Sequence, residues 1–201
     1  MTLQQVNNLA ASFIASGRYE EAFTYLKRCL EDQVSSLETS SPKQPLFTTS
    51  VQISPMITNE DQEAVLAWPL MVFENKIDAH ICSYATALYN AGLACQCQAS
   101  SYNPNGDDED DIDNSRPSRF WQQHAQDYYQ KAYRLAYCLD VPILHLSLCY
   151  NLVALSHQMS DEESFDYWYH NLTQYVLRCD APAPLFRRSW SSIVEAAAPA
   201  A

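Results

Sequence analysis

The chain of 201 residues is long enough for one domain with a sizeable core, and only three residues are glycine, against a usual share of about 7%. This scarcity disfavours β-sandwiches, Rossmann domains and P-loops, which place glycine in tight turns and phosphate-binding loops. The formal net charge of −12 disfavours nucleic acid and anionic membranes as partners, because both would repel the protein. A helical globular protein is the class that remains.

Seven cysteines, an odd number without a C-x-x-C pair, predict buried and reduced thiols rather than disulfides or a zinc site. The longest apolar run, residues 64–73, is far shorter than the ~20 residues of a membrane helix. The N-terminus lacks the basic start and apolar stretch of a signal peptide. We therefore expect a soluble intracellular protein, cytoplasmic or nuclear, with no membrane association.

The first 37 residues predict a helical hairpin. Apolar residues recur every three or four positions up to Ile14, Ser16-Gly17 interrupts the pattern, and the pattern resumes at Tyr19. Residues 38–60 contain three prolines and many Ser, Thr and Gln, so a helix cannot cross them. Segment 46–54 partly alternates in polarity, so a short strand there can pair with residues 67–73.

The rest of the chain alternates between helical and polar segments. A long helix is predicted over residues 76–98, and a solvated acidic loop follows it at residues 100–117. Pro117 stands where the next helix can start, and the helical period continues over residues 120–139. Further helices are predicted at residues 143–158 and 162–179, with a short last helix at 186–196. The sequence thus predicts about seven helices.

A pattern of residue types recurs in these helices. In each predicted helix pair, a small or apolar residue on the first helix has a counterpart on the second. The spacing between them is 12 residues from Ala10 to Ala22 and from Val153 to Phe165, and 33 residues from Gly92 to Ala125. The longer middle spacing corresponds to the acidic loop and its flanks. The phrases Tyr89-Asn90-Ala91 and Tyr150-Asn151-Leu152 are near-copies, which places each in the first helix of a repeat.

The stretch GRYEEAFTYLKRCL, with turn glycine Gly17, aromatic Tyr19 and small Ala22, resembles a tetratricopeptide repeat. Together with the near-copies, it is similar to the degenerate repeat proteins common in algae and other stramenopiles. The resemblance implies an all-α fold, a right-handed α-solenoid of about three TPR-like helical hairpins with insertions and room for one short β-hairpin. The implied parts of this single domain, residues 1–201, are repeat 1 (about 4–37), an insertion (38–75), repeat 2 (about 76–139, interrupted by the acidic loop 100–117), repeat 3 (about 143–179) and a C-terminal tail or cap (180–201).

The third repeat departs from the pattern. It lacks the turn glycine and carries Phe165 where a small residue is expected, which predicts splayed helices. His145 and Cys149 stand four positions apart on one predicted helix, with His157 further along. Two ligands without a partner pair elsewhere are a weak metal signal, so we expect no metal and no cofactor. The aromatic residues could form a ligand box, and the favoured interpretation is an interlayer core: Trp121, Tyr128, Tyr129, Tyr133, Trp168 and Tyr169.

No catalytic motif such as G-x-S-x-G or H-E-x-x-H occurs, so we expect a protein that is not an enzyme. The resemblance implies a non-enzymatic protein–protein interaction module, a scaffold or adaptor whose concave groove binds an apolar or amphipathic peptide or helix of another protein. The alternative is a structural subunit buried in a larger assembly. The predicted partner-binding residues are Asn7, Ala11, Ile14, Tyr89, Leu93, Gln96, Tyr150, Ala154 and His157. None is Lys or Arg, so a chaperone C-terminal carboxylate is not expected to bind.

Overall fold

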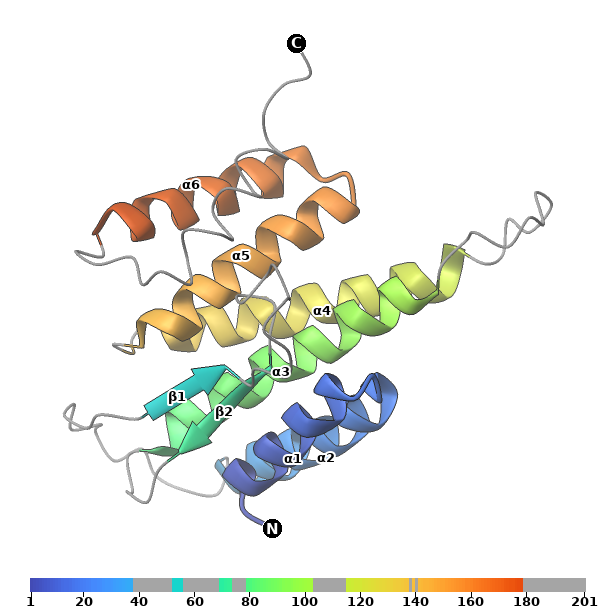
Figure 1. Ribbon diagram of the computed structural model, residues 1–201, viewed down its shortest axis with the longest axis vertical. Helices are drawn as coiled ribbons and strands as arrows, with labels where there is room; N and C mark the ends of the chain where they lie inside the picture. The colour runs from blue at the N-terminus through green and yellow to red at the C-terminus, as the bar shows by residue number, and fades with distance from the viewer. Residues whose placement is uncertain are drawn as a thin grey trace.

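The computed structural model describes residues 1–37, 52–55, 69–73, 79–102, 115–137, 139 and 141–178. These residues form six α-helices and two short strands (Figure 1). The elements are α1 Leu3–Ala15, α2 Tyr19–Leu37, β1 Gln52–Pro55, β2 Leu70–Phe73, α3 Ala79–Ser101, α4 Ser115–Ala136, α5 Pro142–Gln158 and α6 Glu162–Arg178. The mostly helical fold predicted from the sequence is confirmed for this part of the chain.

Consecutive helices pack in pairs, and the pairs follow one another in chain order. The pairs are α1 with α2, α3 with α4, and α5 with α6, as Figure 1 shows from blue to red. Neighbouring pairs meet through α1–α3, α2–α3, α3–α5 and α4–α5 contacts. We call α1, α3 and α5 the first helices and α2, α4 and α6 the second helices.

The turns inside the first and third pairs have the same hydrogen bonds. The N–H groups of Gly17 and Arg18 donate to carbonyls in the last turn of α1 at 3.0 and 2.9 Å, and Gly17 has a φ of 78°. The N–H groups of Ser160 and Asp161 donate in the same way at the end of α5, at 3.1 and 3.0 Å, and Ser160 has a φ of 55°. Both are Schellman motifs with a left-handed residue after the helix. The missing glycine of the third pair therefore leaves the turn unchanged, with Ser160 in its place.

The second pair crosses closely at Gly92 of α3. A Cβ atom added there would lie 2.7 Å from a ring carbon of Tyr129 on α4, which is nearer than real Cβ atoms approach. Tyr129 is fully buried and its hydroxyl donates to Gln96 Oε1 at 2.8 Å, so the ring is held in place. A side chain at Gly92, the small residue of the recurring pattern, would therefore clash with Tyr129.

Aromatic rings join the second helices to one another. Phe23 of α2 meets Trp121 and Tyr128 of α4 edge-to-face, with ring centroids 5.2 and 5.8 Å apart. Tyr133 of α4 meets Trp168 of α6 in the same way at 4.9 Å. These rings pack between helices, as the interlayer-core interpretation predicts, and Tyr169 is half-buried beside Phe165.

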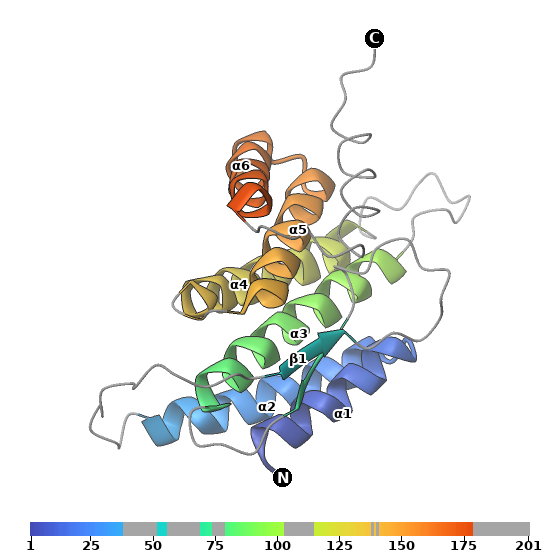
Figure 2. The same ribbon diagram turned by 60° about the vertical axis from the view of Figure 1, so that its left-hand side comes forward.

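The two strands form an antiparallel hairpin in which Ile53 lies opposite Val72 and Pro55 opposite Leu70. Pairing between the two predicted segments is confirmed, although residues 46–51 lie outside the described part of the chain. Strand β2 contacts α1 and α3, whereas β1 contacts α5. The hairpin therefore lies across the first helices, and Figure 2 shows β1 in front of α3.

Helix α4 begins at Ser115, slightly before the predicted start at Pro117, and Pro117 lies in its first turn, where a missing N–H is harmless. Helix α3 runs to Ser101, beyond the predicted residue 98. Residues 103–114 of the predicted acidic loop and the predicted helix 186–196 lie outside the described residues. Among the described helices, none is both long and apolar enough to span a bilayer.

Candidate functional site

A row of side-chain amides lies on the first helices. Asn8, Asn90 and Asn151 each stand two positions before the matched residues of the repeat pattern, Ala10, Gly92 and Val153. Residues at matched positions of stacked helices point to the same side of the stack. In α1 and α3 this side faces the hairpin.

Two of these asparagines each hold one residue of β2 by both of its main-chain groups. Asn8 donates from Nδ2 to the Val72 carbonyl at 2.9 Å, and its Oδ1 accepts the Val72 N–H at 2.9 Å. Asn90 donates to the Leu70 carbonyl at 2.7 Å and accepts the Leu70 N–H at 2.9 Å. Alternate residues of an extended chain present their N–H and C=O groups to the same edge, so one edge of β2 faces the amides and the other faces β1.

Further amides complete the set of hydrogen bonds. Gln4 Nε2 donates to the Val72 carbonyl at 2.9 Å, and Asn7 Nδ2 donates to the Leu70 carbonyl at 3.0 Å. Asn90 Nδ2 also donates to Asn7 Oδ1 at 2.9 Å, which connects α1 directly to α3. Six hydrogen bonds thus join side chains of these helices to the main chain of two strand residues. We call Gln4, Asn7, Asn8 and Asn90 the amide clamp.

An amide side chain suits this task because it carries a donor and an acceptor side by side, as a neighbouring strand does. The N–H of Leu70 and the side chains of Asn7 and Asn90 are buried, so an unpaired group here would cost about 1–3 kcal/mol. A helix could not replace β2 in these bonds, because its own N–H and C=O groups are already paired within it. The clamp therefore recognises an extended main chain.

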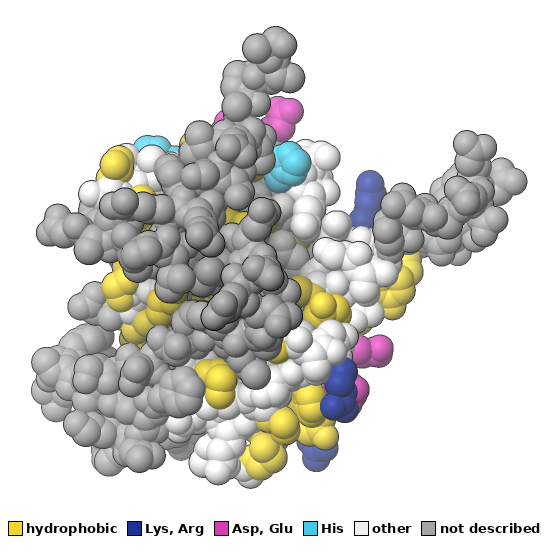
Figure 3. Space-filling view, in the orientation of Figure 1, with side chains coloured by type: hydrophobic (Ala, Val, Ile, Leu, Met, Phe, Trp, Pro, Cys, Tyr) yellow, Lys and Arg dark blue, Asp and Glu magenta, His cyan; other side chains and the backbone are white. Residues whose placement is uncertain are grey.

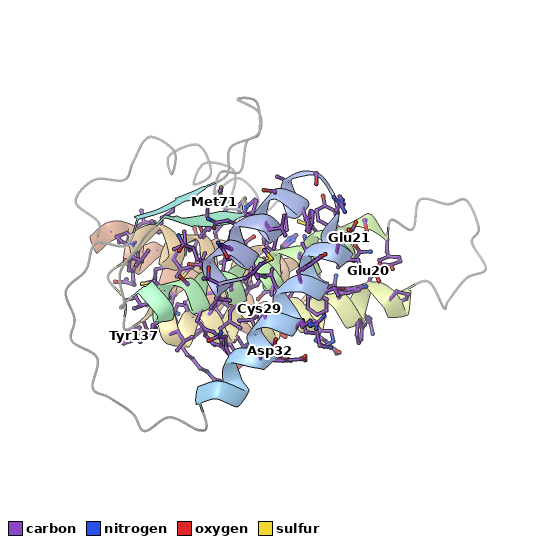
Figure 4. The ribbon with its side chains drawn as sticks, turned by 90° about the horizontal axis from the view of Figure 1, so that it is seen from below. Glu20, Glu21, Cys29, Asp32, Met71 and Tyr137 are labelled. Atoms are coloured by element: carbon purple, nitrogen blue, oxygen red, sulfur yellow. The ribbon has the colours of Figure 1, made fainter. Side chains whose placement is uncertain are left out.

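The side chains of β2 divide between the two faces of the strand. Leu70 and Val72 are 0% exposed, whereas Met71 is only partly buried. Figure 4 shows Met71 on the strand beside α1. The clamp itself has no formal charge, and the Lys and Arg side chains of described residues that are visible in Figure 3 lie on the right-hand side of that view. The site thus combines neutral amides with two enclosed apolar side chains.

The structure places one of the predicted partner-binding residues, Asn7, in the clamp. Ala11, Ile14 and Leu93 are buried, and Tyr150 and Ala154 are half-buried. His157 is exposed and lines a separate pocket near Phe165. Whether these residues contact a partner stays a prediction.

Tyr89 and Gln96, which are also among the predicted residues, connect helices inside the fold. Asn151 donates from Nδ2 to the Tyr89 hydroxyl at 3.3 Å and to the Ser147 carbonyl at 2.8 Å. Burial raises the pKa of Tyr89 far above its usual value, so its hydroxyl stays protonated. Gln96 accepts its bond from Tyr129 on the neighbouring α4.

Sequence reasoning missed Asn8 and Asn90 as site residues by one position. It selected Asn7 and Tyr89, the residues just before them, as the face of the first helices. The recurrence of Asn after Tyr in both near-copied phrases was the signal that identifies the correct position. Nothing in the sequence indicated that residues 70–73 would occupy this face.

The weak metal signal has a structural explanation in α5. His145 stacks on Tyr175 of α6 with ring centroids 4.1 Å apart, and burial lowers its pKa. Burial also raises the pKa of the Cys149 thiol to about 12, so this thiol is protonated at neutral pH. Among the described residues, no three His, Cys, Asp or Glu side chains come together as a metal site.

Comparison with protein-family models, curated proteins and solved structures finds no match for the chain. The contacts of its own residues are therefore the basis for a function.

Proposed function

We propose that the protein is a non-enzymatic protein–protein interaction module, built as a right-handed TPR-like solenoid, whose first helices bind an extended segment of a partner protein. The observation that carries the proposal is the set of six hydrogen bonds between the amide clamp and the main chain of β2. Main-chain groups are the same in every peptide, so chemistry that holds β2 also suits a segment from another chain.

The solenoid part of the proposal is supported by three equivalences between helix pairs. The α1–α2 and α5–α6 turns share one hydrogen-bond pattern. Gly92 of α3 corresponds to Ala10 of α1 in the repeat pattern; Gly92 lies against Tyr129 of α4, and Ala10 is fully buried. The amides of Asn8, Asn90 and Asn151 recur at matched positions. Stacked repeats of this kind present equivalent side chains along one face.

The chemistry of the clamp favours a neutral, apolar segment. A carboxylate would find no cationic side chain among Gln4, Asn7, Asn8 and Asn90, and the formal net charge of −12 repels it. Nucleic acid and anionic membranes are disfavoured by the same charge. We infer that the partner is another protein and that specificity comes from its side chains at the positions of Leu70 and Val72.

Exposed apolar side chains favour a second candidate, a structural subunit covered by a larger assembly. Tyr137 and Leu177 are 77% and 74% exposed, and Figure 4 shows Tyr137 at the edge of the molecule. Light scattering of the purified protein separates the two roles. A monodisperse monomer supports the interaction module, and aggregation that a co-expressed partner relieves supports the subunit.

The direct experiment is selection of binders from a random peptide library, followed by substitution of the peptide main chain. We expect selected peptides to bind as extended segments, so that N-methylation of one residue facing the clamp weakens binding at least tenfold by removing its N–H. Methylation of the neighbouring residue, whose N–H points to the other edge, is the matched control. A library that yields no binder, or binders indifferent to N-methylation at every position, would contradict the proposal.

A further inference from the structure

We propose that β2 is an internal ligand of this protein, and that a partner segment binds by exchanging with it on the amide clamp. The inference rests on the proposed function and adds which surface the partner uses and what must leave it. Strand β2 is not part of the three helix pairs, and the next helix, α3, begins at Ala79. The clamp holds it through side chains and not through a ladder between main chains, so α1 and α3 keep all their helical hydrogen bonds when β2 leaves.

The geometry of β2 defines the partner segment. It must be extended, with the N–H and C=O groups of two alternate residues available to Asn8 and Asn90. The side chains of those two residues must be apolar and of the size of Leu and Val, because Leu70 and Val72 are completely enclosed. The residue between them can vary more, because Met71 is partly exposed.

Exchange has a thermodynamic signature that a separate binding site lacks. An incoming segment would make the same bonds to Asn8 that Val72 makes, so Asn8→Ala removes those bonds from the ligand and from the competing strand alike. The two losses cancel in the apparent affinity of the intact chain. They do not cancel in a chain whose own strand cannot dock, because there only the ligand loses them.

The experiment uses a fluorescein-labelled peptide with the sequence of residues 67–75, titrated by fluorescence anisotropy. It compares the intact chain with the variant Leu70→Asp/Val72→Asp, in which two carboxylates keep β2 out of its enclosed site. We expect the double variant to bind the peptide at least tenfold more tightly than the intact chain, because it has no competing strand. Adding Asn8→Ala should weaken binding of the peptide at least tenfold in the double variant and less than threefold in the intact chain.

Three controls make this result specific. A scrambled peptide of the same composition should not bind, and the peptide N-methylated at the residues equivalent to Leu70 and Val72 should lose its affinity. The exposed Gln123→Ala on α4 should change no affinity in either chain. The exchange model would be overturned if the double variant keeps its helical content but does not bind the peptide. It would also be overturned if Asn8→Ala changes the peptide affinity equally in both chains.

A second measurement covers the case in which the double variant does not fold. In the intact chain, hydrogen exchange of the Leu70 and Val72 amides should be at least 100-fold faster than that of buried amides in the middle of α3, since local release of β2 exposes them. Equal protection would mean that β2 leaves only on global unfolding, and the inference would be wrong. A library peptide that binds while β2 keeps its protection would also refute exchange, and it would leave standing the role of an interaction module but not the use of the amide clamp.

Discussion

The two layers of the molecule are held together by different chemistry. The second helices are joined by rings, such as Tyr133 against Trp168, whereas α1 and α3 are joined by amides that also hold a strand. Ring packing buries apolar area and tolerates small shifts. Amide hydrogen bonds are directional and contribute little net free energy each, because water competes for the same groups. The first helices also contribute much of the apolar core, so the amides are the part of that layer that the proposed binding role uses.

The largest expected effect comes from removing a ring from the contacts between the second helices, which we call the ring layer. Trp168 is 7% exposed and packs edge-to-face on Tyr133, so Trp168→Ala should lower the free energy of unfolding by about 3–5 kcal/mol. Chemical denaturation followed by circular dichroism measures this loss. Tyr167→Ala, at a 56% exposed neighbour, is the control and should cost much less. Equal losses in the two variants would show that the ring layer does not carry the stability assigned to it.

The close crossing of α3 and α4 gives the next effect. Gly92→Ala places a methyl group against the fixed ring of Tyr129 and should destabilise the protein by about 1–3 kcal/mol. The double variant Gly92→Ala/Tyr129→Leu should lose less than the sum of its two single variants, because the contact is shared. Strict additivity in denaturation experiments would contradict the contact.

A charge placed in the amide layer should make stability depend on pH. Asn90→Asp would face the Leu70 carbonyl and Asn7 Oδ1, so burial and these oxygens should raise the pKa of the new carboxyl above its unfolded value of about 3.9. Its stabilising protonated form is then present at low pH and is lost as the pH rises through the folded-state pKa. Thermal unfolding should therefore show Asn90→Asp less stable at pH 7 than at pH 5, relative to the wild type. Asn90→Ala should show a difference from the wild type that is independent of pH.

The smallest effect concerns the turn between α5 and α6. Ser160→Gly relieves the left-handed conformation of Ser160 and should stabilise the protein by about 0.5 kcal/mol, after the greater freedom of glycine in the unfolded chain is counted. Gly17→Ala, the reverse change at the matching turn, should destabilise it by about 1 kcal/mol. A destabilising Ser160→Gly would mean that the two turns are not equivalent.

The helices were predictable because their apolar period is strong and their turns carry local signals, as at Gly17. Their ends were less exactly predictable: Pro117 locates the first turn of α4, but a proline is tolerated anywhere in that turn and does not fix the first residue, Ser115. The clamp was harder to predict, because Asn7 and Asn8 have the same side chain and differ only in direction by one helical position. The strand that the clamp holds could not be predicted from local sequence patterns, since the contact between Asn8 and Val72 joins residues 64 positions apart.

The most direct test of the difference between the layers is residue-resolved hydrogen exchange in Asn90→Ala, with Trp168→Ala measured beside it. We predict that Asn90→Ala speeds exchange of the Leu70 and Val72 amides at least tenfold, and that in both the wild type and the variant these amides exchange at least 100-fold faster than the buried amides of α3 and α5. Trp168→Ala should instead speed exchange throughout α4, α5 and α6. Leu70 and Val72 amides as strongly protected as the buried amides of α3 and α5 would contradict the account, because the strand would then leave only when the whole protein unfolds.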